Sequence, residues 1–138
     1  MNIYEALNKD HEEVKGLLNE LVSLGEGDES RRNDLINQIR DGLIPHSRAE
    51  EAVFYNAMRA MNSANDIVMH GYQEHVEAEA LLRTLQVAGK IDTGWTTVAK
   101  KLRESLVHHI NEEEGKIFSV AKEMFSEEEA VQMATAFE

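Results

Sequence analysis

Two segments of the chain place a glutamate four residues after a histidine and a second glutamate directly behind the first. One segment begins at His46 and the other at His109. Residues i and i+4 lie one above the other on a helix, so each segment directs an imidazole and a carboxylate toward one point. Imidazole nitrogen and carboxylate oxygen are ligands that suit iron, manganese and zinc. The spacing therefore predicts that His46 and Glu50, and likewise His109 and Glu113, bind metal.

Two other segments each carry a histidine on the stripe of apolar residues that should face a core. His11 interrupts the stripe over residues 3–21, and His75 interrupts the stripe over residues 68–85. Carboxylates and imidazoles are costly to bury without partners, so four helices that each bury a histidine need compensation. A bound metal supplies it, and bundle cores with carboxylate and histidine ligands on facing helices form di-metal sites.

Three more His-x-x-x-Glu pairs, at positions 70/74, 75/79 and 108/112, carry less weight because clustered glutamates raise the number of such pairs. The helical repeat turns His108 by about 100° from the inward stripe and turns His70 by about 140° from His75. We therefore expect His70 and His108 on the solvent side of their helices.

Four long helices must position these residues. Apolar residues recur at three- and four-residue steps, the period of a helix, over residues 3–21, 35–57, 68–85 and 95–120. Asn2 with Glu5 has the capping-box pattern of a helix start, and Ser126 with Glu129 repeats it before a short tail helix. Ser30 is a candidate N-cap for the second helix.

Several residues predict where the long helices are interrupted. Gly25 and Gly27 predict the first loop, residues 62–65 the second, and Gly89 the third. Asp92 or Thr93 can then cap the fourth helix. Pro45 lies inside the second helix and predicts a kink there.

These patterns predict an all-α fold. We expect an antiparallel up-and-down four-helix bundle with a short C-terminal helix, organised as one domain over residues 1–138. The tail helix carries Val131 and Phe137 on an apolar face, which can fold onto the bundle or bind a partner.

The composition excludes several classes of function. The net charge is −12 and the chain has no cysteine. The charge disfavours nucleic-acid and membrane partners, and the lack of cysteine excludes disulfides, thiolate metal sites and iron–sulfur clusters. No apolar run approaches the roughly 20 residues that span a bilayer, and no signal peptide is visible. A cytoplasmic protein is expected.

The chain resembles the hemerythrin-like HHE cation-binding family over about residues 2–120. The resemblance rests on Asp10-His11, on the segment from Pro45 to Phe54, on Glu74-His75 and on the segment from His109 to Phe118. It implies a left-handed four-helix bundle that holds a non-haem di-iron centre. Glu50 and Glu113 would be bridging carboxylates, and the terminal ligands would be His11, His46, His75 and His109.

The chain departs from the oxygen-carrying hemerythrins on the third helix. Those proteins place two histidines four residues apart there, whereas this chain has Gly71 four residues before His75 and Glu79 four residues after it. One metal is therefore short of an imidazole, and Glu79, His70 or water are candidates to replace it. Tyr72 could hydrogen-bond a metal-bound oxygen or serve as a core aromatic.

The resemblance implies two bound iron ions, with manganese or zinc as alternatives, and a small ligand such as dioxygen, nitric oxide or peroxide. We expect a protein that binds or senses such a ligand, or that buffers iron, rather than a dedicated enzyme. A di-iron peroxidase or oxidase is the first alternative, although no apolar substrate pocket is visible in the sequence. A zinc-stabilised or metal-free protein-interaction module is the other.

Overall fold

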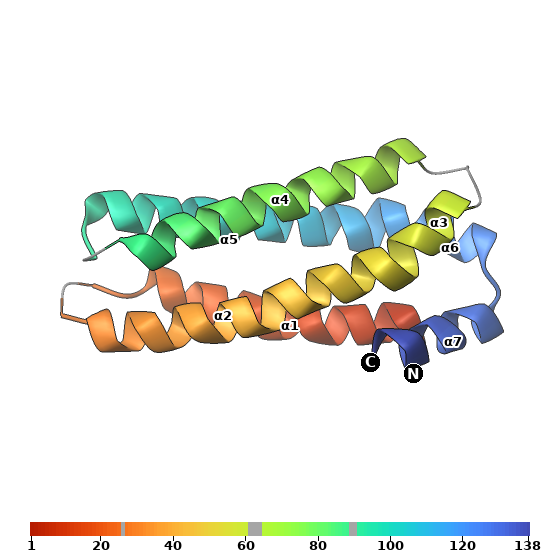
Figure 1. Ribbon diagram of the computed structural model, residues 1–138, viewed down its shortest axis with the longest axis horizontal. Coiled ribbons are helices and arrows are strands. Elements are labelled where there is room, and N and C mark those ends of the chain that lie inside the picture. The colour runs from red at the N-terminus through yellow and green to blue at the C-terminus, as the bar shows by residue number, and fades with distance from the viewer. Residues whose placement is uncertain (26, 61–64, 89–90) are drawn as a thin grey trace.

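The computed structural model describes residues 1–25, 27–60, 65–88 and 91–138 (Figure 1). Its long helices are α1 (Ile3–Val22), α2 (Glu29–Glu50), α4 (Asn65–Val87) and α5 (Thr93–Glu112). Short helical segments extend two of them, namely η1 (Glu51–Tyr55) and α3 (Asn56–Ala60) after α2, and η2 (Glu113–Ile117) and α6 (Phe118–Met124) after α5. The chain ends with α7 (Glu127–Phe137).

Successive long helices run in opposite directions and lie side by side along one axis (Figure 1). The expected all-α, up-and-down bundle with a C-terminal helix is therefore confirmed. No described helix is long and apolar enough to cross a membrane. Helix α7 packs beside α1, where Ala130 and Ala134 are buried, and the ring of Phe137 lies 5.5 Å from that of His46. The tail thus folds onto the bundle and leaves Val131 on its outer face.

Side-chain caps define several helix ends as the sequence predicts. Asn2 and Ser126 each form a complete capping box, and the Asp92 side chain accepts from the Trp95 backbone N–H. The expectation for Ser30 is wrong, because α2 begins at Glu29 and its N-cap position is Asp28, whose side chain makes no capping bond. The predicted breaks at residues 62–64 and at Gly89 lie outside the described residues.

Helix α2 continues through Pro45 as far as Glu50, and the departure from α-helical geometry comes directly afterwards. Segments η1 and η2 are π-helical, so the Asn56 N–H donates to the carbonyl of Glu51 and the Phe118 N–H to that of Glu113, five residues back in each case. Short π-helical insertions occur frequently at functional sites. Here η1 begins directly after Glu50, and η2 begins at Glu113, so each lies at the glutamate of a His-x-x-x-Glu segment.

The apolar core consists of two clusters. One gathers leucine and isoleucine side chains with Trp95 at the end of the bundle that holds the α1–α2 loop, and the other gathers Ile3, Tyr4, Phe54, Tyr55 and Phe118 at the opposite end. On every long helix the buried histidine or glutamate lies between residues of the two clusters. The polar groups therefore occupy the middle of the bundle, closed off by apolar packing at both ends.

Candidate metal centre

The structure brings the six candidate ligands together in the middle of the bundle. Helix α1 contributes His11, α2 contributes His46 and Glu50, and α4 contributes His75. The last two, His109 and Glu113, lie at the junction of α5 and η2. Both glutamates have no exposed surface, and three of the four histidines are buried to the same extent as the core.

The Nε2 atoms of all four histidines point toward the two glutamates. Glu113 has His109 Nε2 at 3.2 Å and His11 Nε2 at 3.3 Å. Glu50 has His75 Nε2 at 3.0 Å and His46 Nε2 at 3.9 Å. Neighbouring ligands on one metal lie about 3.0 to 3.4 Å apart when the metal–ligand bonds are about 2.1 Å long. Three of the four separations therefore fit groups that share a cation, and His46 Nε2 lies about half an ångström farther from Glu50.

The Nδ1 atoms of the same histidines are held from outside by four other carboxylates. Each histidine pairs with a different partner at 2.7–2.8 Å, the pairs being His11–Glu114, His46–Asp10, His75–Glu51 and His109–Glu74. A carboxylate only accepts, so each Nδ1 carries a hydrogen and each Nε2 faces inward, where its lone pair can bind a metal once that nitrogen is deprotonated. Carboxylate partners of this kind orient metal-binding histidines and raise their basicity.

Sequence reasoning assigned no role to these four carboxylates, although a signal was present. Each lies next to a candidate ligand in the chain, as Asp10 does before His11 and Glu51 does after Glu50. Because a metal-binding histidine almost always has an outer hydrogen-bond partner, an acidic residue next to a candidate ligand is a candidate for that partner.

Several polar atoms of the centre are buried without a hydrogen bond among the described residues. They are both carboxylate oxygens of Glu50, Oε1 of Glu113 and Nε2 of His109. Two sets of ligand atoms converge there, one from Glu50, His75, His109 and Glu113 and the other from His11, His46 and Glu50. Glu50 belongs to both sets. Unpaired buried carboxylate oxygens beside imidazole nitrogens fit metal cations, which would supply the missing partners.

The two glutamates differ in their affinity for a proton when no metal is bound. Burial raises the pKa of the Glu50 carboxyl well above its usual range, and the neighbouring Glu113 carboxylate raises it further. Burial also raises the pKa of Glu113, but the Nε2 atoms of His109 and His11 that face this carboxyl outweigh burial and hold its pKa well below the usual range.

The histidines respond to the same neighbours. Burial lowers the pKa of His109, but Glu113 and Glu74 outweigh burial and raise it to about 9. The pKa of His11 is likewise raised against burial by Glu113 and Glu114. Burial and the nearby His109 lower the pKa of His75. Without metal, the centre therefore holds protons on the groups nearest Glu113.

Tyr55 is a buried residue of the centre that sequence reasoning missed. Its hydroxyl donates to Glu113 Oε2 at 2.7 Å, and its ring stacks on that of His75. In α-helical register Tyr55 would lie about 140° from Glu50, but the π-helical η1 brings it back to the inner face. Burial and the two glutamates raise the pKa of the phenol far above its usual value, so it is a hydrogen donor in the metal-free centre.

Gly71 provides the space for this hydroxyl. A Cβ atom at position 71 would lie 2.7 Å from the Tyr55 hydroxyl oxygen and 2.9 Å from the ring carbon that carries it. Position 71 is one of the two positions four residues from His75. The phenol of Tyr55 therefore occupies space that a side chain on the third helix would otherwise fill.

The structure places the other candidate residues outside the buried group. The Glu79 carboxylate pairs with the Arg48 guanidinium, and Tyr72 donates to Asn56 Oδ1 at 3.1 Å. His70 lies at the outer surface, where it faces Glu74 and Glu112.

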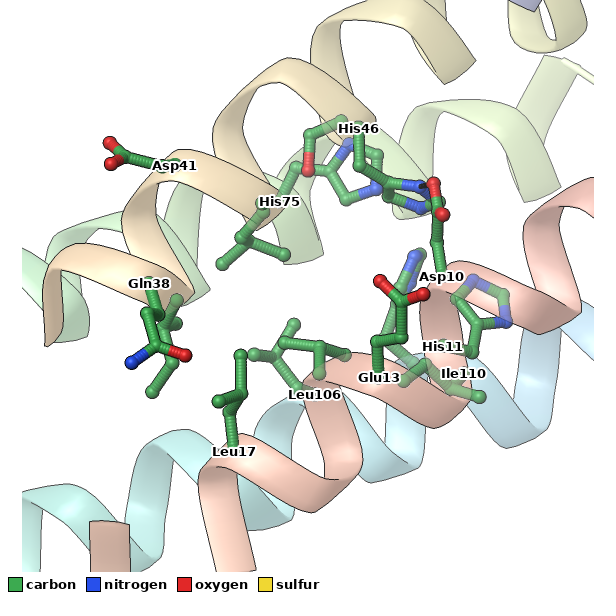
Figure 2. Close-up of a pocket in the computed structure, with 16 residues that line it drawn as sticks. Asp10, His11, Glu13, Leu17, Gln38, Asp41, His46, His75, Leu106 and Ile110 are labelled. Carbon is green, nitrogen blue, oxygen red and sulfur yellow. Dashed lines mark hydrogen bonds and ion pairs between the residues drawn. The ribbon is translucent and has the colours of Figure 1, made fainter. Parts of the chain in front are cut away.

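A cavity of about 460 Å³ leads to the centre between α1, α2 and α5. The imidazoles of all four histidines line its inner part, apolar side chains such as Leu17, Ile39 and Leu106 form its walls, and acidic side chains stand at its rim. Figure 2 shows His46, Asp10 and His11 on one side of the cavity, with Leu17 and Gln38 across from them.

Comparison with known proteins gives a family and two similar sequences. The model of a family described as the hemerythrin HHE cation binding domain matches residues 2–121. A DNA nickase from Nostoc sp. is 27% identical over 137 residues, which cover 99% of this chain and 38% of the nickase. An uncharacterized hemerythrin-like protein from Schizosaccharomyces pombe is 28% identical over 138 residues, 99% of this chain and 67% of that protein. The chain thus spans well under half the length of the nickase.

A solved structure has the same fold. The crystal structure of a hemerythrin HHE cation binding domain-containing protein from Mycobacterium kansasii superposes with a TM-score of 0.84 at 22% identity, over 99% of this chain and 83% of that one. At this sequence identity, the similarity shows a shared arrangement of the helices and no shared function.

Proposed function

Because this chain belongs to the hemerythrin HHE cation-binding domain family, we propose that its buried cluster holds two iron ions and binds a small ligand such as dioxygen, nitric oxide or peroxide. One observation carries the proposal. All four imidazole Nε2 atoms face two glutamates with unpaired oxygens, while all four Nδ1 atoms are held by carboxylates. The Nε2 atoms are thus directed toward the position of the metal, and the hydrogen bonds at Nδ1 hold the imidazoles in that orientation.

We infer a di-metal centre because Glu50 belongs to both sets of converging ligand atoms. One ion would take His75, His109 and Glu113 with Glu50, and the other would take His11 and His46 with Glu50. A mixed imidazole and carboxylate set suits iron, with manganese or zinc as alternative occupants. Iron in this centre would supply redox chemistry and a coordination position for a small ligand.

We further propose that the Tyr55 hydroxyl serves the metal that would take His75 and Glu113, in place of a second histidine on the third helix. It lies 2.7 Å from Glu113 Oε2, beside Gly71. Bound directly, it would add an anionic oxygen ligand, and as a hydrogen donor it would hold Glu113 in position. An added anionic ligand favours the ferric state, and this argues for ligand sensing or peroxide chemistry over reversible oxygen transport.

The cavity supports access of a small molecule to the metals. Its volume of about 460 Å³ far exceeds that of a diatomic ligand, and imidazoles line its inner part. A water molecule takes only about 30 Å³ in the liquid. Dioxygen, nitric oxide or peroxide could therefore enter without any rearrangement of the helices.

The first experiment measures metal content per chain together with the visible spectrum, recorded without oxygen and then after air, nitric oxide or peroxide. We expect about two irons per chain, as in the di-metal bundles, and a spectrum that changes on ligand addition. His46→Ala and His109→Ala should each lower bound iron sharply. His108→Ala is the matched control, because His108 precedes His109 but is exposed to solvent. Full iron occupancy in both His46→Ala and His109→Ala would overturn the assignment.

A peroxidase or oxidase acting on an organic substrate is the second candidate, and the cavity favours it. Pockets for small organic molecules have volumes of roughly 300–1,000 Å³ and mostly apolar walls, and this cavity matches in both respects. Its acidic rim, which includes Asp10, Glu13 and Asp41, would favour a substrate with a cationic or hydrogen-donating group.

Two variants separate the candidates. Leu17→Trp should fill the apolar part of the cavity and slow turnover of an organic substrate, while iron content and nitric oxide binding stay unchanged. Peroxide turnover well above that of free iron, lost in Glu113→Ala, supports an enzyme. Turnover equal to that of free iron supports a binding or sensing protein.

A further inference from the structure

A second group of histidines and glutamates lies on the outer side of α4 and α5. It consists of His70 and Glu74 on α4 and of His108 and Glu112 on α5, and we call it the outer cluster. Both pairs have the i, i+4 spacing that places two side chains on the same face of a helix. His70 is 53% exposed and His108 is 67% exposed, so the outer cluster is open to solvent.

The separations in the outer cluster are those of metal ligands. His70 Nε2 lies 3.5 Å from both Glu74 Oε2 and Glu112 Oε2, and His108 Nε2 lies 3.1 Å from Glu112 Oε2 and 3.8 Å from Glu74 Oε2. Four ligands arranged tetrahedrally around zinc lie about 3.3 to 3.4 Å apart, given bonds of about 2.0–2.1 Å. The four observed distances bracket that value.

The two glutamates of the outer cluster make few hydrogen bonds, although they lie close to the protein surface. Glu74 is only 8% exposed, and its one hydrogen bond among the described residues, through Oε1, is to His109. Its Oε2 faces the two outer histidines. Glu112 Oε2 is a buried atom with no hydrogen-bond partner within the described part of the chain.

A small cavity adjoins these unpaired oxygens. Its volume is about 210 Å³, and His70, Glu74 and Glu112 line it. Because two carboxylates direct unpaired oxygens toward the same imidazoles, a divalent cation at this point would neutralise both carboxylates and complete a four-coordinate set.

We infer that the outer cluster is a second, solvent-accessible site for a divalent transition metal such as zinc, with the converging atoms of His70, Glu74 and Glu112 as its ligands and the neighbouring His108 able to rotate in as a fourth. It shares no proposed ligand with the buried centre. The two sites touch through Glu74, whose Oε1 holds His109 Nδ1 at 2.8 Å while its Oε2 faces the outer cluster. A cation in the outer cluster would draw charge from Glu74 and weaken its hold on His109, so occupancy outside would alter the centre inside.

The test titrates iron-loaded protein with zinc chloride near neutral pH, by calorimetry and by metal analysis after desalting. The wild type should take up one zinc per chain that the double variant His70→Ala/His108→Ala does not, with affinity at least about tenfold weaker in the variant. Iron content should be the same in both proteins. Glu104→Gln is the control, because it removes an exposed carboxylate from the same helix outside the cluster.

Each outcome decides for or against the outer site. Equal zinc binding by the wild type and the double variant, or zinc uptake that occurs only with loss of iron, would overturn it and leave an ordinary set of histidine–glutamate ion pairs. Zinc density between α4 and α5 in a crystal soaked with zinc would support it. The outer site is inferred from geometry outside the buried centre, so its failure can be distinguished from failure of the di-iron proposal. A protein that binds no iron would still show the difference of one zinc between the wild type and the double variant.

Discussion

The centre is built from two halves with the same local sequence and different surroundings. The first half comprises His46, Glu50 and η1, and the second comprises His109, Glu113 and η2. In both halves a histidine and a glutamate one turn apart precede a second glutamate, and a π-helical segment begins at Glu51 in the first half and at Glu113 in the second. Local sequence therefore gives both halves the same backbone path.

The neighbours of the first glutamate make the halves unequal. Glu113 receives the Tyr55 hydroxyl at 2.7 Å and has two imidazoles within 3.3 Å, whereas both oxygens of Glu50 lack a hydrogen bond among the described residues. The residue that corresponds to Tyr55 in the second half is Phe118, which has no hydroxyl. Burial and the neighbouring Glu113 carboxylate raise the pKa of Glu50, whereas the facing imidazoles of His109 and His11 outweigh burial and lower the pKa of Glu113.

This difference indicates that the charge of a buried carboxylate depends on the side chains that pack against it, from its own helix and from others. Without metal, Glu50 takes up a proton and Glu113 pairs with charged histidines. With two metals bound, both glutamates would be ionised and the two halves would become alike. Comparing the halves with and without metal therefore tests the proposal directly.

The largest expected effect comes from replacing each glutamate by its amide. Glu50→Gln and Glu113→Gln should both lose most of their bound metal, because each removes an anionic ligand. Without metal the two should differ. Glu113→Gln breaks a buried ion pair and should lower the free energy of unfolding by about 3–5 kcal/mol, whereas Glu50→Gln mimics the protonated carboxyl and should change it by less than about 1 kcal/mol.

Metal analysis and chemical denaturation of the chelator-treated proteins measure these effects, with Glu123→Gln as an exposed control. Equal destabilisation by the two substitutions would show that the halves carry the same charge without metal.

The second-largest expected effect is a pH dependence of the stability of the metal-free protein, which bound metal should remove. The pKa of His109 rises from an unfolded value of about 6.5 to about 9 in the folded, metal-free protein. The resulting stabilisation, at most about 3 kcal/mol, is fully present below pH 6.5 and is lost as the pH rises through 9. The raised pKa of Glu50 acts in the same direction.

Melting temperatures measured with and without iron across this range test the point. The metal-free protein should lose stability as the pH rises, while the iron-loaded protein should not, because metal takes the place of the proton. Parallel curves for the two forms would mean that metal does not bind at His109.

The inward histidines and glutamates could be predicted from sequence because they break apolar stripes at helical spacing. His11, His46, His75 and His109 are costly to bury without compensation, and their register alone places them on facing helices. The fold followed from the same periodicity, and caps at Asn2, Asp92 and Ser126 defined helix starts.

Tyr55 could not be predicted in this way, because the α-helical period fails where the helix becomes π-helical. The period predicted over residues 35–57 is that of an α-helix, whereas in η1 the adjacent residues Phe54 and Tyr55 are both fully buried. The carboxylates Asp10, Glu51, Glu74 and Glu114 lie off the inward stripe. They could be predicted only from the requirement that the Nδ1 atom of each metal-binding histidine has a hydrogen-bond partner.

A smaller effect is expected from the hydroxyl that distinguishes the halves. Tyr55→Phe removes a hydrogen bond to Glu113 and should weaken metal binding by about 10- to 100-fold, with a change in the visible spectrum if the phenol binds iron. Tyr72→Phe is the matched control, since the ring of Tyr72 lies 5.3 Å from that of Tyr55 and its hydroxyl bonds to Asn56 instead. Equal metal affinity and an unchanged spectrum in Tyr55→Phe would remove Tyr55 from the centre.

The smallest effect should come from Glu79, the carboxylate four residues after His75. Its partner Arg48 also donates to Glu51, which in turn holds His75 Nδ1. Arg48 is half exposed, so the pair should contribute no more than about 1 kcal/mol to stability. Glu79→Gln should therefore keep its full metal content, whereas Glu51→Gln should lower metal affinity because it acts on a ligand histidine directly. Metal loss in Glu79→Gln as large as in Glu50→Gln would instead make Glu79 a metal ligand. Glu79 would then supply the anionic group that is proposed for Tyr55.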